Sequence, residues 1–347
     1  MPARPPVTLL AVVTLLAACG GGASAPASQH PPPPPPPPGG GQLFSADNAW
    51  NRPVDTAPLS ASSGAMLAAL QVAGGWGGPQ TSGQGKVQVD FSIARLEASA
   101  TTPAAPFAPK ASGYYTPDCD PLTSFPLPDG GALEGESGYS CVGHGDCHLL
   151  VVDRAHQKLY EAWDTDVVGG TVTATCAVVW ELATAYPATL RGDFCTSADA
   201  AGLPISALLF DADEVAAGVI EHAIRFILPN ARMAAGVFVR PATHIGAPSG
   251  AADLPPYGTR LRLRADYPLA SLPSEAARVV ARALQRYGMI LSDGGNIALT
   301  AADDRFTTHT WAQLGFDSHS LGSLLVSDFQ VIEAGPAIDY GGGSCSR

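Results

Sequence analysis

The segment from Thr196 to Ile205, which reads Thr-Ser-Ala-Asp-Ala-Ala-Gly-Leu-Pro-Ile, places one carboxylate among small residues. Small neighbours allow a substrate to approach both that carboxylate and the backbone around it. Asp199 is therefore a candidate general acid or base. The alternative is structural, because an aspartate in a turn or at the start of a helix often caps nearby backbone N–H groups.

A predicted β-hairpin supplies a second set of polar groups, because strands His148–Asp153 and Lys158–Trp163 flank a polar turn. Side chains alternate along a strand, so Glu161 shares a face with Trp163, and His148 lies on the paired strand. A tryptophan beside acidic groups suits sugar binding, because the indole stacks on C–H-rich sugar faces while carboxylates bind hydroxyls. The hairpin is a candidate floor for a cleft.

Asp199 and Glu161 are the carboxylate pair that we predict to be catalytic, as an acid or base and its partner. Glycoside hydrolysis generally uses two such groups. For Glu161 an ion pair with a cation across the sheet is an equally good expectation.

A helix is predicted over Asp211–Leu228, with an acidic start and an apolar stripe. On it Glu214 and His222 lie two turns apart on one face, where a carboxylate can raise the pKa of an imidazole. The structural alternatives are that His222 is buried with its hydrogen bonds satisfied and that Arg225 pairs with Glu221.

His244 follows a predicted strand and enters a loop rich in Gly and Pro, which is where rigid scaffolds often present functional groups. Asp293 precedes two glycines and is expected either in a hairpin turn or at the mouth of the sheet as a site acid. The residues predicted to bind substrate are His148, Trp163, His222, Arg225, His244 and Asp293.

Metal and cofactor chemistry has weaker support. The segment Cys141–His148 contains ligand types that zinc prefers, but it lacks paired C-x2-C units, and disulfide formation competes in an oxidising compartment. G-x-S-x-G, H-E-x-x-H, Walker and G-x-G-x-x-G motifs are absent, which weighs against the common serine hydrolases, zincins and nucleotide enzymes. We predict no cofactor and no metal, with a metallohydrolase using His148, His222, His244 and a carboxylate as an alternative.

The N-terminus is typical of an exported lipoprotein. Residues 1–18 carry an apolar run too short to span a bilayer, followed by a lipobox-like Leu16-Ala-Ala-Cys19. We expect lipidation of Cys19, although an ordinary cleaved signal is an alternative. Residues 19–41 include the proline run Pro31–Pro38, which forms an extended, semi-rigid stalk. A ligand for a proline-binding module is the second interpretation. The predicted location is a bacterial membrane surface outside the cytoplasm, the outer membrane included.

Six further cysteines form an even set, as expected of disulfides in an exported protein. Cys141–Cys147 and Cys176–Cys195 each close a short segment and are the favoured pairs. Cys119 and Cys345 remain as the third.

Composition and charge exclude two classes of protein. Lys and Arg total 19 against 31 for Asp and Glu, a formal net charge of −12, which makes nucleic acid a poor partner. No apolar run beyond residue 18 is long enough to span a membrane, which excludes an integral transporter.

Residues 42–334 are predicted to form a single globular domain, followed by a Gly-rich tail over 335–347. The strand and helix pattern does not alternate as in a βαβ fold. We predict an α+β fold with a mainly antiparallel β-sheet or sandwich, two to three packed helices and disulfide cross-links. Predicted strands are Lys86–Ile93, His148–Asp153, Lys158–Trp163, Thr171–Leu182, Gly236–Arg240, Arg260–Ala265, Met289–Ser292, Asn296–Thr300 and Phe329–Glu333, and predicted helices are Leu59–Val72, Asp211–Leu228 and Pro273–Tyr287.

Several segments together resemble an uncharacterised family of secreted bacterial proteins, over roughly residues 45–333. The family pattern is most specific in its Thr-Ser-Ala-Asp-Ala-Ala-Gly-Leu-Pro and Tyr-Gly-Met-Ile-Leu-x-Asp motifs, and the resemblance implies no particular activity. The residues between Cys119 and Cys147 look like an insertion relative to it. The matching segments are Ala46–Asn51, His148–Asp153, Lys158–Glu161, Thr196–Ile205, Asp213–Phe226, Arg240–His244 and Tyr287–Gly294.

The leading functional hypothesis is a surface-anchored hydrolase acting on an extracellular glycan. A non-catalytic lipoprotein that binds glycan or cell wall is the alternative from another class, and the His-dependent metallohydrolase is the third. The expected partners are a membrane, through the lipid, and a polysaccharide.

Overall fold

The computed structural model describes residues 42–77 and 85–347. The predicted signal sequence, the lipidation site Cys19 and the proline-rich stalk lie outside the described residues. Within the described part, no helix is both long enough and apolar enough to cross a membrane.

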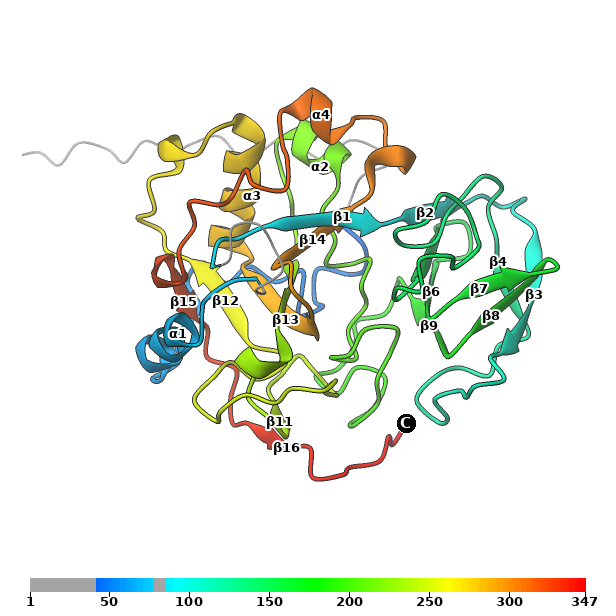
Figure 1. The fold of residues 1–347 in the computed structure, drawn as a ribbon, viewed down its shortest axis with the longest axis horizontal. Helices are drawn as coiled ribbons and strands as arrows, with labels where there is room; N and C mark the ends of the chain where they lie inside the picture. Colours follow the sequence, from blue (N-terminus) through cyan, green and yellow to red (C-terminus); the bar gives the residue numbers. More distant parts are fainter. Residues whose placement is uncertain (1–41, 78–84) are drawn as a thin grey trace, which may run out of the picture. The chain divides into compact units, whose positions relative to one another are not determined.

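A six-stranded mixed sheet forms the larger part of the fold (Figure 1). β10 and β13 pair in parallel at its centre, β1 and β14 pair in parallel at one side, and the remaining neighbours run antiparallel. In spatial order its strands are β1 (Val89–Ile93), β14 (Leu299–Ala302), β10 (Ile224–Leu228), β13 (Met289–Gly294), β12 (Arg260–Leu263) and β15 (Phe329–Val331).

Helices cover this sheet. α3 contacts β12, α1 contacts β15, and α2 contacts both α3 and α4. α3 has a continuous buried face that includes Val280 and Leu284, as its apolar spacing predicts. The α-helices are α1 (Ser63–Val72), α2 (Ala212–Ala217), α3 (Glu275–Arg286) and α4 (Trp311–Leu314), and the short 3₁₀ helices are η1 (Asn230–Arg232), η2 (Leu269–Ser271), η3 (Asp304–Phe306) and η4 (Val326–Asp328).

Two four-stranded sheets form a second packed region (Figure 1). The chain passes into this region directly from β1, because only Ala94 separates β1 from β2. Leu96, Phe107, Phe125 and Leu149 from these sheets form a core of their own. One sheet has the order β2 (Arg95–Ala98), β5 (Leu149–Asp153), β6 (Lys158–Trp163) and β9 (Cys176–Glu181), the other has the order β4 (Ser124–Pro126), β3 (Ala104–Pro109), β8 (Thr171–Ala174) and β7 (Asp166–Val168), and a separate ribbon pairs β11 (Val237–Phe238) with β16 (Ile338–Asp339).

The α+β prediction is confirmed. Among the described strands eight pairings are antiparallel and four are parallel, so the sheets are mixed with antiparallel pairing in the majority. The predicted hairpin is present as β5 and β6, with Leu150 opposite Glu161.

The predicted helix over Asp211–Leu228 is wrong beyond its first turns. Asp211 and Glu214 form a capping box that starts α2, but Gly218 takes a left-handed conformation (φ 82°) and ends it. The chain then enters β10, where Ile224 and Ile227 suit an extended strand better than a helix. The apolar positions that mimic a helical stripe belong partly to a buried central strand.

The predicted strand Thr171–Leu182 is two strands. Thr175 bends the chain between β8 and β9, and its backbone N–H donates to the Trp163 carbonyl. β8 then pairs with β3 and β7, whereas β9 pairs with β6.

The disulfide Cys141–Cys147 is confirmed, but the predicted Cys176–Cys195 pair is wrong. Cys176 bonds to Cys119, because the segment before Asp120 runs beside β9 and the Asp120 N–H donates to the Ala177 carbonyl. Proximity in sequence does not reveal this packing.

The segment 335–347, predicted as a Gly-rich tail, is fixed to the rest of the protein. Cys345 bonds to Cys195 across a sequence separation of 150. β16 pairs with β11, and the Arg347 guanidinium contacts the Asp120 carboxylate at 2.6 Å.

Gly258 and Gly218 allow a matched test of how closely the protein packs around a glycine. Both have positive φ, but a Cβ at Gly258 would lie 1.8 Å from the Val239 carbonyl oxygen, whereas one at Gly218 meets open space. We expect Gly218→Ala to cost about 1–2 kcal/mol of unfolding free energy, from backbone strain alone. Gly258→Ala should cost at least about 2 kcal/mol more, because the backbone must also move. Denaturant unfolding of both variants measures this difference, and equal costs would contradict the packing around Gly258.

Candidate functional site

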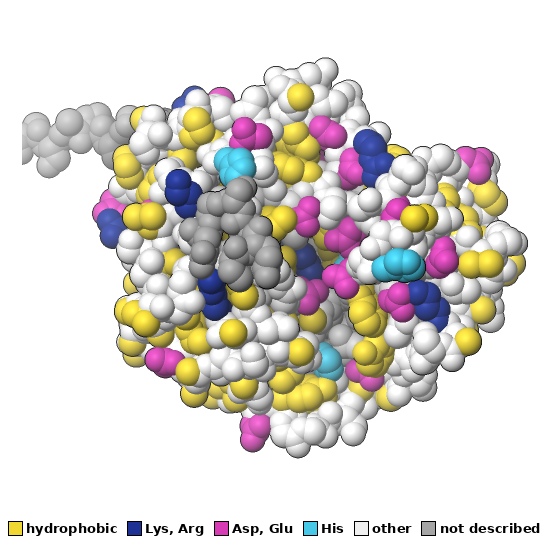
Figure 2. All heavy atoms as spheres, viewed as in Figure 1, with side chains coloured by type: hydrophobic (Ala, Val, Ile, Leu, Met, Phe, Trp, Pro, Cys, Tyr) yellow, Lys and Arg dark blue, Asp and Glu magenta, His cyan; other side chains and the backbone are white. Residues whose placement is uncertain are grey.

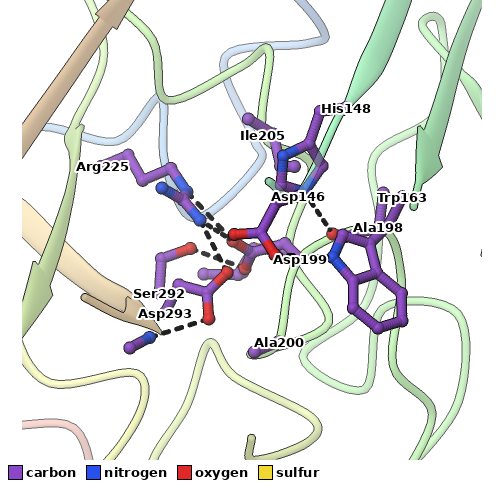
Figure 3. Close-up of polar contacts among 12 residues, drawn as sticks. Asp146, His148, Trp163, Ala198, Asp199, Ala200, Ile205, Arg225, Ser292 and Asp293 are labelled. Carbon is purple, nitrogen blue, oxygen red and sulfur yellow. Dashed lines mark hydrogen bonds and ion pairs between the residues drawn. The ribbon is translucent and has the colours of Figure 1, made fainter. Parts of the chain in front are cut away.

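Arg225 lies at the centre of the candidate site, on β10, and its side chain is only 4% exposed. Its Nε lies 3.0 Å from Asp199 Oδ1, and its Nη2 lies 2.8 Å from Asp293 Oδ2 (Figure 3). One guanidinium therefore joins carboxylates from two distant parts of the chain. The predicted i,i+4 pair with Glu221 does not form, because Arg225 belongs to a strand and not to a helix.

The strand β13 delivers Asp293 to this arginine through an irregularity in its pairing. Phe226 is opposite Leu291, but Ile227 is opposite Asp293, so Ser292 is an extra residue in the register. Such a bulge re-aims side chains. Ser292 and Asp293 both reach the cluster, where the Ser292 hydroxyl donates to Asp199 Oδ2 at 2.6 Å.

The Asp199 carboxylate is fully buried and is bound by Arg225 and Ser292. Among the described residues this carboxylate accepts no hydrogen bond from a neighbouring backbone N–H, and its partners are the Arg225 and Ser292 side chains. Burial raises the pKa of Asp199 although Arg225 opposes that shift. The Asp199 carboxylate therefore pairs with Arg225 and is not a cap for a turn or a helix.

Asp293 is the more accessible member of the pair, with 24% of its side chain exposed. Burial raises its pKa to about 6, with Arg225 opposing and Asp199 adding to the shift. Because Arg225 Nη2 contacts one oxygen of each carboxylate, at 3.0 and 2.8 Å, those two oxygens lie within about 6 Å of each other. A carboxyl with this pKa can exchange a proton near neutral pH.

A pocket of about 560 Å³ opens beside Asp293. The Trp163 and Tyr115 rings lie 6.0 Å apart in its wall, and Trp163 Nε1 donates to Asp146 Oδ1 at 3.1 Å. Figure 2 shows acidic side chains gathered near the middle of the face that it displays. The residues lining the pocket are Tyr115, Asp146, Trp163, Thr196, Ser197, Ala198, Asp199, Ala200, Asn230, His244, Ile245, Gly246, Ala247, Tyr257, Asp293 and Gly294.

His148 supports the pocket wall from behind. Its Nδ1 lies 2.6 Å from Glu134 Oε2, and its Nε2 donates to the Ala198 carbonyl at 3.0 Å. Burial alone would lower the pKa of His148, but the Glu134 carboxylate outweighs it and raises that pKa to about 9. Burial would raise the pKa of Glu134, but His148 outweighs it and lowers that pKa to about 2. The pair is ionic at neutral pH and fixes the loop that carries Asp199.

Glu161 and His222 lie outside the lining of this pocket. The Glu161 carboxylate is fully buried and accepts hydrogen bonds from Trp180 Nε1 and from the N–H groups of Ile205 and Ser206. It has no ion-pair partner among the described residues, so neither of the two expectations for it describes its contacts. Burial raises its pKa to about 7 although those hydrogen bonds oppose the shift. The inward side of β6 faces the Ile205 loop, which hides this carboxylate.

His222 is buried with its hydrogen bonds satisfied, as its structural alternative predicts. Its Nδ1 donates to the Ala223 carbonyl at 2.8 Å, and its Nε2 lies 3.3 Å from Glu214 Oε1. The contact with Glu214 exists even though no helix joins the two residues. His244 does line the pocket, held between the Ala200 carbonyl and the Tyr340 hydroxyl, at 3.0 and 2.8 Å.

Glu136, Cys141 and Cys147 are the one cluster of potential metal ligands in residues 42–77 and 85–347. Both sulfurs are in a disulfide, so they offer no thiolate to a zinc ion. Within the same residues His148, His222 and His244 do not gather into a ligand group, because each ring binds its own partners.

Four residues of the candidate site have no pattern in the sequence that points to them: Asp146, Tyr115, Tyr257 and Glu134. Asp146 lies between the two cysteines of a segment that looks like an insertion. Tyr115 and Glu134 belong to irregular loops, where no periodicity assigns an orientation. Only the folded arrangement of these loops brings them to the pocket or behind it.

Glu134→Gln tests the ion pair behind the pocket. Without the carboxylate, burial dominates, and the pKa of His148 should fall from about 9 to below its ordinary value of 6.5. In the parent protein His148 stabilises the fold fully below pH 6.5, and this contribution is lost as pH rises through about 9. NMR titration of the ring protons measures the shift. Glu136→Gln, which alters a nearby acid that does not contact His148, is the control, and a His148 pKa unchanged by Glu134→Gln would contradict the pairing.

Arg225→Met should be strongly destabilising, by about 3–5 kcal/mol, because it leaves a buried Asp199 without its cation. Adding Asp199→Asn removes the unpaired charge and should recover part of the loss. Denaturant unfolding of the single and double variants tests this coupling. Purely additive costs would show that Arg225 and Asp199 do not depend on each other.

The chain was compared with family models, curated proteins and solved structures. None of them matches it. The functional conclusion therefore rests on the residues around Arg225 and on the pocket beside them.

Proposed function

We propose that the chain is an extracytoplasmic lipoprotein whose pocket binds and hydrolyses a glycan. One observation carries this proposal. The aromatic rings of Trp163 and Tyr115 and the carboxylates of Asp146 and Asp293 line the same pocket. Aromatic faces stack on sugar rings, and carboxylates bind hydroxyls and transfer protons.

Asp293 is the proposed general acid. Its pKa of about 6 keeps a protonated fraction available near neutral pH, and its side chain reaches the pocket. Arg225 binds Oδ2 and the Gly294 N–H donates to Oδ1 at 2.7 Å, so the carboxyl is held in one orientation. Fixed orientation favours proton transfer to a bound leaving group.

Asp146 is the proposed partner carboxylate, in the role that the sequence analysis gave to Glu161. It is exposed, lines the same pocket and contacts the edge of the Trp163 indole. Asp199 has no exposed side-chain surface, and in this proposal it is a positioning residue that orients Arg225 and supports the raised pKa of Asp293.

The three disulfides fit an oxidising compartment outside the cytoplasm. Together with the lipobox-like Leu16–Cys19, they support a domain that is anchored by a lipid and meets polymers at the cell surface.

A panel of polysaccharides incubated with the full chain tests the proposal, with release of reducing ends as the measurement. We expect Asp293→Asn and Asp146→Asn each to lower kcat/KM by about 10²–10⁴-fold, the usual worth of acid–base catalysis. Asp266→Asn, which alters an exposed carboxylate paired with Arg264, is the control and should keep full activity. Binding without cleavage of any polymer would favour the non-catalytic alternative, and full activity in both site variants would reject this site.

The pH profile gives a separate test. If Asp293 acts as the acid, kcat/KM should be high below about pH 6 and fall as Asp293 loses its proton above it. Asp293→Asn should remove this limb from any residual activity. A profile that rises through the same range would assign Asp293 the role of base.

A further inference from the structure

The wall of the pocket contains a buried hydroxyl without a regular hydrogen-bond partner. Tyr257 lines the pocket and is fully buried, and its Oη makes no hydrogen bond of regular geometry in the described residues, with the Gly246 N–H as a nearby backbone donor. This oxygen stands beside the lining residue Gly246, where an added Cβ would lie 2.8 Å from it. Buried polar atoms are normally paired, so one without a regular partner beside a cavity is a position where a water or a ligand group can complete the pairing.

The charge around the pocket is the second observation. Asp146, Asp199 and Asp293 line it, and among residues 42–77 and 85–347 no Lys or Arg does. The nearest guanidinium, that of Arg225, is 4% exposed and is already bound to two of these aspartates. Glu134 and His148 neutralise each other. An entering anion therefore meets carboxylates with no free cation, whereas an entering cation is attracted by them.

The aromatic wall favours the same kind of group. The faces of Trp and Tyr rings attract cations, and Trp163 and Tyr115 stand together beside Asp146. An ammonium group has three donors and no acceptor, so it suits a lining of carboxylate and hydroxyl oxygens.

We infer that the pocket selects a sugar that carries a free, protonated amine, and that Tyr257 Oη accepts a hydrogen bond from this ligand. The inference rests on the proposed function, because it names the substrate class of the same pocket. Neutral sugars bind more weakly here, and uronic acids bind least.

Titration calorimetry of the full chain tests the preference with three oligosaccharides of equal length, built from glucosamine, N-acetylglucosamine or galacturonic acid. The titrations are done at about pH 6.5, where most of Asp293 is ionised and a large share of the sugar amine is still protonated. We expect the glucosamine oligomer to bind at least about tenfold more tightly than the N-acetylated one, and its affinity to fall with added salt. Equal affinities, or tighter binding of the uronate, would overturn the inference and leave the glycan-binding proposal standing. If none of the three binds and no polymer in the panel is cleaved, both proposals fail.

Tyr257→Phe tests the hydroxyl itself. Binding of the glucosamine oligomer should weaken about tenfold, since a hydrogen bond to a charged group is lost. The melting temperature of the free protein should stay the same or rise, because the removed hydroxyl makes no regular hydrogen bond there. Tyr267→Phe, which removes a hydroxyl near Ser323 outside the pocket, is the control and should bind normally. Undiminished binding by Tyr257→Phe would overturn the role of this residue.

Discussion

The buried charge of Arg225 is the constraint on which the site depends. A guanidinium that is 4% exposed needs acceptor groups close by, because an uncompensated charge in the protein interior is very costly. It has two, Asp199 from the loop before α2 and Asp293 from β13. The requirement to pair this charge therefore fixes the loop and the strand end relative to each other, and it does so at the edge of the pocket.

The two aspartates share an arginine but differ in what they can do. Asp199 is sealed by Ser292 and Arg225, so its charge is used inside the protein. Asp293 is partly open, and burial still raises its pKa to about 6. The fold thus separates a sealed carboxylate from one that the pocket exposes within a single ion-pair cluster, and neighbouring carboxyls in different environments can take different roles.

Much of the fold follows from local patterns in the sequence. The hairpin β5–β6, the helix α3 and the strand predicted over Met289–Ser292 have strong periodicity or clear end signals. The structure contains each of them, and the strand extends to Gly294. The helix proposed over Asp211–Leu228 is wrong because Gly218 allows a left-handed end, and because a central strand buried on both faces is as continuously apolar as a helix core. Periodicity alone does not separate these two cases.

The residues of the candidate site were harder to predict from the sequence than the elements of the fold. Asp199, Trp163, His244 and Asp293 do line one pocket, and their residue types and loop positions pointed to them. Glu161 was predicted to line the cleft, but it lies outside the pocket. The alternation along a strand shows which side chains share a face, but it does not show which face another loop covers. The partners Glu134 and Asp146 come from irregular segments, whose positions depend on disulfides and long-range contacts.

The disulfide between Cys195 and Cys345 links the candidate pocket to the far end of the chain. It ties the residue just before Thr196 to a segment that is synthesised 150 residues later, and Tyr340 from that segment holds His244 in the pocket wall. The Cys195–Cys345 bond therefore adds a covalent tie to a loop that Arg225 and Ser292 already hold through Asp199. Loss of residues 340–347 would leave the ion pairs of Arg225 in place but would remove both this tie and the Tyr340 hydroxyl that holds His244, so the integrity of this pocket wall depends on the far end of the chain.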